Sequence, residues 1–250
     1  MWYDISYEER SQLIMKEVLY EIPVNDIFDI PCECPVCAMR KKLDEDEVAF
    51  AMGPSYMEDD IRLTTDEIGF CAHHMQMMYD YENRLGLGLI LNTHMQNIMK
   101  NIDKLQKKGR TSSGGLFSKK TGSSLSDYIK KTTESCFVCQ RIADTFDRYL
   151  VTTLYLYEKD LAFRNKFKSC RGFCLEHYGR LFDIAPSYLH GSVLEDFTED
   201  LNHIFLSNFK RMQEEVSWFV DKHDYRNKEA DWKTSKDALP RAMTKVNGIF

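Results

Sequence analysis

The sequence predicts an all-α protein of two similar helical modules, each stapled by one zinc ion bound to three cysteines and one histidine. A Cys-x2-Cys motif followed by a Phe-Cys-x2-His motif occurs twice, in the same order. Apolar residues recur at intervals of three and four, as at Ile142, Phe146 and Leu150, which is typical of one face of a helix. No alternating strand pattern is present, and Gly and Pro are sparse.

The two motif pairs supply the ligands of the predicted metal sites. The first motif pair consists of Cys34, Cys37, Cys71 and His74, and the second of Cys136, Cys139, Cys174 and His177. Between the motifs lie 33 residues in the first pair and 34 in the second. Three thiolates and an imidazole fill the tetrahedral shell of zinc. We therefore expect two structural zinc ions, with no coordination position left for a substrate.

Other interpretations of the same motifs remain open. An iron–sulfur cluster usually needs four thiolates. Cys34-Pro-Val-Cys37 has the spacing of a thiol–disulfide site, but the βαβ pattern of a thioredoxin is missing. Cys34 and Cys37 could also share a metal with Cys174 and His177, because the sequence does not exclude pairing across the two copies.

The local geometry of each Phe-Cys-x2-His motif can also be predicted. We expect Cys71 and Cys174 at the start of a helix, with His74 and His177 one turn later. Residues three apart lie on one face of a helix, so both side chains can reach one metal. The positive end of a helix also favours the thiolate form of cysteine.

An internal repeat predicts the domain limits. Aligned with itself at an offset of 102 to 103, the chain matches at the ligands and beyond them. The stretch at 106–126 is rich in Gly, Ser and Lys, which is typical of a flexible linker. The predicted parts are zinc module 1 at 1–105, the linker at 106–126, zinc module 2 at 127–220, and a C-terminal segment packed on the helices at 221–250.

Some residues have no equivalent in the repeat. Cys32 and Cys170 lack a cysteine counterpart and are expected to be free thiols. The C-terminal segment concentrates polar and aromatic groups that could contact a ligand or partner: His223, Tyr225, Arg226 and Trp232. The alternative is that its aromatic residues only anchor the segment to the helices.

Composition limits the class of protein. The formal charge of −6 argues against general nucleic-acid binding, which needs a basic surface. No apolar run approaches the length of a membrane span, and the first residues have no signal-peptide pattern. We expect a cytoplasmic protein, in which paired cysteines indicate a metal rather than disulfides.

The chain resembles a bacterial family of unknown function. The resemblance lies in the paired cysteine motifs and in a tail like Lys222-His223-Asp224-Tyr225-Arg226 followed by Lys236-Asp237-Ala238. It implies a soluble bacterial protein and carries no established activity, so it supplies no catalytic residue. We expect a non-enzymatic interaction or regulatory protein that binds an unknown protein partner or itself. The alternatives are a redox-responsive zinc–thiolate protein and, more weakly, an enzyme with a site between modules and tail.

Overall fold

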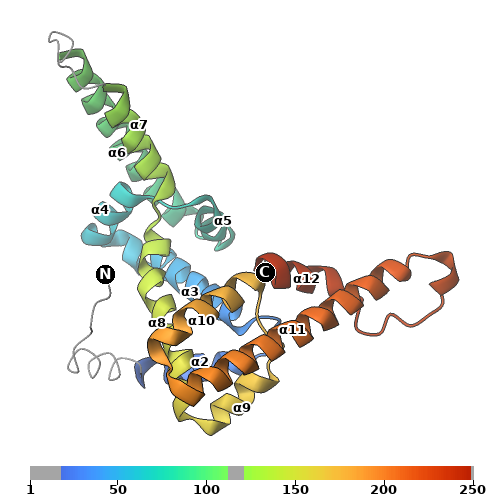
Figure 1. The fold of residues 1–250 in the computed structure, drawn as a ribbon. Coiled ribbons are helices and arrows are strands. Elements are labelled where there is room, and N and C mark those ends of the chain that lie inside the picture. Colours follow the sequence, from blue (N-terminus) through green and yellow to red (C-terminus); the bar gives the residue numbers. More distant parts are fainter. Residues whose placement is uncertain (1–17, 112–120, 249–250) are drawn as a thin grey trace. The chain divides into compact units, whose positions relative to one another are not determined.

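The computed structural model describes residues 18–111 and 121–248, and the chain there is helical with no strand (Figure 1). Three short 3₁₀ helices are η1 (Val18–Tyr20), η2 (Pro54–Met57) and η3 (Tyr225–Asn227). The α-helices are α2 (Glu21–Phe28), α3 (Pro35–Met52), α4 (Asp59–Ile68), α5 (Ala72–Asp80), α6 (Arg84–Thr111), α7 (Thr121–Glu134), α8 (Phe137–Lys159), α9 (Leu161–Ser169), α10 (Leu175–Tyr188), α11 (Gly191–Asp221) and α12 (Ala238–Asn247). The predicted all-α class is confirmed.

The chain divides into two compact units that differ from the predicted modules. Unit 1 takes Met1–Lys41 together with Phe146–Phe250, and unit 2 takes Lys42–Thr145. Helices α3 and α8 each begin in one unit and end in the other. Each unit therefore combines the start of one sequence module with the later helices of the other module.

The predicted linker at 106–126 is partly helical. Residues 106–111 complete α6, and residues 121–126 begin α7. The centre of the predicted linker, at 112–120, lies outside the described residues. Helices α6 and α7 pack against each other inside unit 2. Two neighbouring helices therefore reach into the ends of the predicted linker.

The two motif glycines share an unusual backbone conformation. Gly69 has a φ of +73° at the end of α4, and Gly172 has a φ of +83° just before α10. A Cβ atom at Gly69 would lie 2.7 Å from Nε2 of His94, so this turn also requires a residue without a side chain. Two residues after each glycine, a cysteine stands as the N-cap of the next helix. The glycine turn thus positions the cysteine at the helix start.

Unit 1 has an aromatic core. The Phe167 ring lies 5.2 Å from that of Tyr157, 5.3 Å from that of Phe173 and 5.4 Å from that of Phe197, and all four side chains are buried. Asp160 caps α9 by accepting hydrogen bonds from the backbone amides of its first turn. Burial of several rings at these distances stabilises the end of α8 against α9 and α11.

The C-terminal segment belongs to unit 1. Helix α12 packs on α10 and α11, with Ala238 and Lys245 buried. None of the helices in the described ranges is both long and apolar enough to cross a bilayer.

Candidate metal centres

The first group of predicted ligands, called cluster one, lies in unit 1. It consists of Cys34 and Cys37 at the start of α3, and Cys174 and His177 at the start of α10, all four buried. Nδ1 of His177 lies 3.5 Å from Sγ of Cys34, 3.3 Å from that of Cys37 and 3.2 Å from that of Cys174. The sulfurs of Cys37 and Cys174 are 3.6 Å apart.

The second group, called cluster two, lies in unit 2. It consists of Cys71 and His74 at the start of α5, and Cys136 and Cys139 at the start of α8. Nδ1 of His74 lies 3.2 Å from Sγ of Cys71, 3.3 Å from that of Cys136 and 3.4 Å from that of Cys139. Cys71 and Cys139 are partly exposed, so cluster two is more accessible than cluster one.

The distances between the ligand atoms of each cluster can be compared with those expected around a tetrahedral zinc ion. With Zn–S bonds of about 2.3 Å and Zn–N bonds of about 2.05 Å, a tetrahedron places two sulfurs about 3.8 Å apart and a sulfur and a nitrogen about 3.6 Å apart. The sulfur pairs at 3.6 and 3.9 Å and the sulfur–nitrogen pairs at 3.2 to 3.5 Å are close to these edges. Both groups therefore fit one metal ion each.

The grouping answers a question that the sequence left open. Each cluster joins the Cys-x2-Cys of one motif pair to the Cys-x2-His of the other. A site formed inside each sequential module does not occur. The crossed arrangement, which the sequence left open, does occur. Each compact unit thus holds one cluster, because α3 and α8 start in opposite units.

All four motifs stand at helix N-termini. The backbone N–H groups of Cys37, Cys139 and His177 each donate to the sulfur three residues earlier, at 3.4 to 3.5 Å. Two helix starts meet at each cluster, and their positive ends stabilise negative thiolates. The prediction that Cys71 and Cys174 begin helices, with a histidine one turn later, is confirmed.

The thiols of a cluster cannot all ionise unless a cation joins them. Burial, followed by the neighbouring Cys174, raises the pKa of Cys34 to about 12. The thiols of Cys34 and Cys37 instead hydrogen-bond to Cys174 and hold its pKa far below the ordinary value. In cluster two, burial and Cys136 raise the pKa of Cys139 to about 12. A metal must therefore displace protons on binding, which makes its affinity dependent on pH.

The histidines of the two clusters have different neighbours. Nε2 of His74 lies 3.0 Å from the carboxylate of Asp44, a buried residue of α3. A carboxylate at this nitrogen orients a metal-bound imidazole and raises its basicity. At His177 the ring of Phe146 packs edge-on, with centroids 5.8 Å apart. Sequence reasoning missed Asp44, although a carboxylate on the helix that follows a metal motif is a usable signal.

A buried ion-pair network lies beside cluster one. The Glu33 carboxylate is 3.3 Å from Nζ of Lys245, 2.5 Å from the Arg211 guanidinium and 3.3 Å from that of Arg241. Lys245 also donates to the backbone carbonyls of Glu33 and Arg171. After α12, Gly248 closes over the cluster, since a Cβ there would lie 3.6 Å from Sγ of Cys37. The C-terminal helix therefore covers this metal centre.

The four predicted contact residues of the tail do not form one site. His223 and Trp232 pack together, with ring centroids 6.1 Å apart. Tyr225 is 85% exposed at the tip of the turn, and Arg226 is exposed and paired with Asp224 at 2.6 Å. The turn is held by the buried Lys222.

Lys222 explains why the tail folds back. Its ammonium donates to the carbonyls of Asn227, Lys228 and Ala230 at 2.5 to 2.8 Å. An ammonium offers three donors, so all of them are used in this turn. Sequence reasoning named Lys222 as the first residue of the tail motif but gave it no structural role.

Cys32 and Cys170 belong to neither cluster. Burial raises the pKa of the Cys170 thiol to about 11. Cys170 lines a pocket of about 570 Å³ beside the tail, together with arginines of α11 and α12. Every cation that lines this pocket is already in an ion pair with a carboxylate. The pocket therefore offers a ligand little uncompensated charge.

Comparison with known protein families matches this chain to one family. "Family of unknown function (DUF6062)" matches residues 15–250, which include both clusters and the tail. The chain belongs to this family. Comparisons with curated proteins and with solved structures found no match. The resemblance predicted from the cysteine motifs and the tail is confirmed, and the family brings no activity with it.

Proposed function

We propose that both clusters bind structural zinc and that the protein acts without catalysis, as an interaction or regulatory protein of the bacterial cytoplasm. The supporting observation is that each cluster offers four ligands at tetrahedral spacing. A zinc ion bound by all four has no open position for water or substrate, so it can neither polarise a carbonyl nor supply hydroxide. The metals then hold helices together.

Metal analysis tests the zinc assignment. Protein purified without chelator should contain two zinc ions per chain. Cobalt substitution should give the intense visible bands of a tetrahedral, thiolate-rich site. Iron with labile sulfide would overturn the assignment, and so would a disulfide between Cys34 and Cys37 in freshly prepared reduced protein.

We also propose that the chain arose by duplication. The order of helices around the motifs supports this. In the first half, α2 precedes the Cys-x2-Cys motif, the long helix α3 begins at that motif, and the short helix α4 precedes the Cys-x2-His motif at the start of α5. In the second half these roles belong to α7, α8, α9 and α10. The tail has no counterpart and is the place where a distinct role would arise.

The partner, a protein or a second copy of the chain, contacts the exposed tip of the tail in this proposal. Tyr225 and Arg226 are its accessible aromatic and cationic groups. Arg226→Ala should leave zinc content, helicity and melting temperature unchanged, because the residue is exposed and its ion pair with Asp224 lies within its own turn. The same variant should weaken binding to the partner, or self-association measured by light scattering. An Arg226→Ala protein that loses zinc would show that the turn is structural.

A second candidate is a redox-responsive protein, and the exposure of cluster two favours it. Cys71 and Cys139 are partly exposed, whereas cluster one is buried. Peroxide would convert two thiolates of cluster two to a disulfide, be reduced to water, and release zinc. Mild hydrogen peroxide should then release one zinc ion per chain, and a thiol reductant with zinc should restore it. Oxidation confined to Cys32 and Cys170, with both zinc ions retained, would contradict this candidate.

A further inference from the structure

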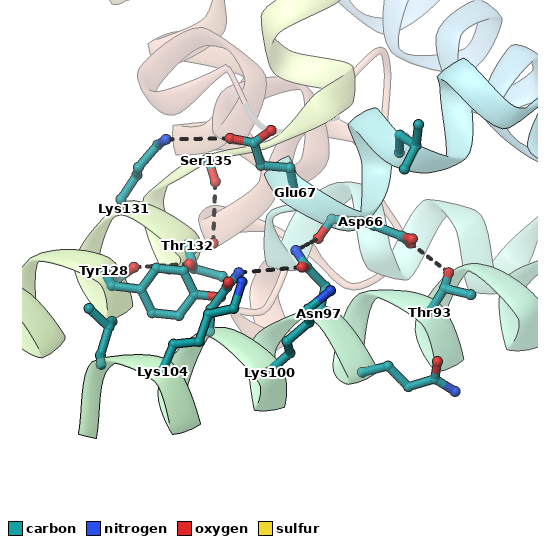
Figure 2. Close-up of a pocket in the computed structure, with 14 residues that line it drawn as sticks. Asp66, Glu67, Thr93, Asn97, Lys100, Lys104, Tyr128, Lys131, Thr132 and Ser135 are labelled. Atoms are coloured by element: carbon teal, nitrogen blue, oxygen red, sulfur yellow. Dashed lines mark hydrogen bonds and ion pairs between the residues drawn. The ribbon is translucent and has the colours of Figure 1, made fainter. Parts of the chain in front are cut away.

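A polar pocket of about 820 Å³ lies in unit 2, between α4, α6 and α7 (Figure 2). Its volume is in the range of small-molecule sites. The metal ligands do not line it, so it is separate from cluster two. The pocket combines three lysines, two acidic residues, several hydroxyl and amide groups, and a few apolar side chains.

The acidic residues of this pocket are already engaged. The Asp66 carboxylate accepts a hydrogen bond from the Thr93 hydroxyl at 2.5 Å. Glu67 faces Lys131, as Figure 2 shows, and the charged atoms of the pair lie 3.9 Å apart. The backbone carbonyl of Asp66 accepts from Asn97 at 2.8 Å. These contacts fix the α4 wall of the pocket against α6, and the one ion pair among the described residues that line the pocket is that between Glu67 and Lys131.

Lys100 and Lys104 are the two lysines of the pocket for which the described residues provide no ion pair. They stand four residues apart on α6, so their side chains lie on one face of the helix, where like charges repel each other. Neither forms an ion pair among the residues that the structure describes. On a chain with a net charge of −6, this is a local positive site that attracts anions.

The Tyr128 hydroxyl is a neutral hydrogen-bond donor in the same pocket as Lys100 and Lys104. The hydroxyl of Tyr128 on α7 lies 3.4 Å from the amide of Asn101, from which it accepts a hydrogen bond. Its own proton is therefore free to be donated to a ligand. The Tyr128 ring, Leu63 and Leu105 are the apolar groups among the side chains that line the pocket.

We propose that this pocket binds a small phosphate monoester, with the phosphate held by Lys100, Lys104 and the Tyr128 hydroxyl and the organic part against the apolar groups that line the pocket. A phosphate monoester carries close to two negative charges at pH 7, which matches two ammonium groups. Its oxygens accept hydrogen bonds from both lysines and from the tyrosine.

Calorimetric titration of the zinc-loaded full chain with phenyl phosphate tests the proposal. Binding should be saturable and should weaken as salt is added. The Lys100→Gln/Lys104→Gln variant should bind about tenfold more weakly or worse, because two charge-assisted contacts are lost. The matched control is Lys107→Gln/Lys130→Gln, which removes the same charge from α6 and α7 outside the pocket and should bind like the wild type.

A gain of binding provides a second, independent measurement. Glu67→Gln removes the carboxylate that faces Lys131, so it should tighten phenyl phosphate binding severalfold. Phenol, which has the ring without the charge, should not bind. The proposal is overturned if phenyl phosphate does not bind, if phenol binds equally well, or if both double-lysine variants lose the same affinity.

Discussion

The buried carboxylate of Asp44 contacts the histidine of cluster two, and this contact distinguishes the two clusters. It accepts the Nε2 proton of His74, whereas the ring of Phe146 packs edge-on against His177. This hydrogen bond fixes the imidazole so that Nδ1 faces the three sulfurs. The two centres therefore have similar ligands but different surroundings.

Replacing Asp44 tests this contribution. Asp44→Ala should weaken zinc binding at cluster two by about 10- to 100-fold, because the imidazole loses its orienting partner. Cluster one should keep its affinity. Competition with a chromogenic chelator measures both sites. Asp46→Ala is the control, since Asp46 is exposed on the same helix and pairs with Lys42 at 2.6 Å. Equal losses in both variants would exclude a specific role for Asp44.

At Glu33 a buried carboxylate balances several cations of the C-terminal helix and α11. Glu33→Gln leaves the Lys245 ammonium buried without its counter-charge, and breaking such a pair costs about 3–5 kcal/mol. Thermal melting of the zinc-loaded variant should show a large loss of stability. Glu229→Gln, at an exposed position of the tail, should melt like the wild type. A stable Glu33→Gln protein would mean that the network contributes little.

At the scale of elements, each metal centre joins helices that are distant in the sequence. Cluster two joins the start of α8 to the start of α5, and cluster one joins α3 to α10. In each pair the ligands stand at the N-terminal ends of both helices. Loss of one ligand should therefore loosen a helix in the other half of the sequence.

Hydrogen exchange of Cys139→Ser tests the crossed arrangement. Protection should fall in α5, about 60 residues upstream of the substitution, because Cys71 and His74 lose a shared metal. Protection in α10 should stay near that of the wild type. Cys170→Ser is the control and should change neither helix. Lost protection in α10 with α5 unchanged would indicate that the sites form within the sequential modules.

At the scale of the whole molecule, the two units should differ in how readily they lose their metal. Cluster one is buried and covered by α12, whereas cluster two has two partly exposed sulfurs. A structural zinc site contributes folding free energy directly, so each unit should lose order when its own metal leaves.

Stepwise chelation measures this difference. With increasing chelator, the first zinc equivalent should come from cluster two, and exchange should increase within Lys42–Thr145 before it increases elsewhere. Mass spectrometry of the intact protein should show a one-zinc species that populates during the titration. Simultaneous loss of both ions, or earlier loosening of α10 than of α5, would contradict the expected order.

The sequence by itself determined the features that depend on local physics. The cysteine motifs identify all eight candidate ligands, and the spacing of the apolar residues identifies an all-α chain. The position of Cys71 and Cys174 at helix starts also follows from a few neighbouring residues, since Gly69 and Gly172 make the turn that precedes them. Each of these depends on contacts within about one turn of helix.

Only the tertiary structure decided which motifs form one cluster. The separations of 33 and 34 residues are nearly equal, so local geometry does not distinguish a site within a module from one across modules. Helices α3 and α8 each begin in one unit and end in the other. The cysteines at the start of each helix therefore lie in a different unit from the helices that follow it in the sequence. The Asp44 contact and the lysine pocket likewise join helices that are separate in the sequence. Their energies come from packing between distant segments, and a pattern of neighbouring residues does not contain that information.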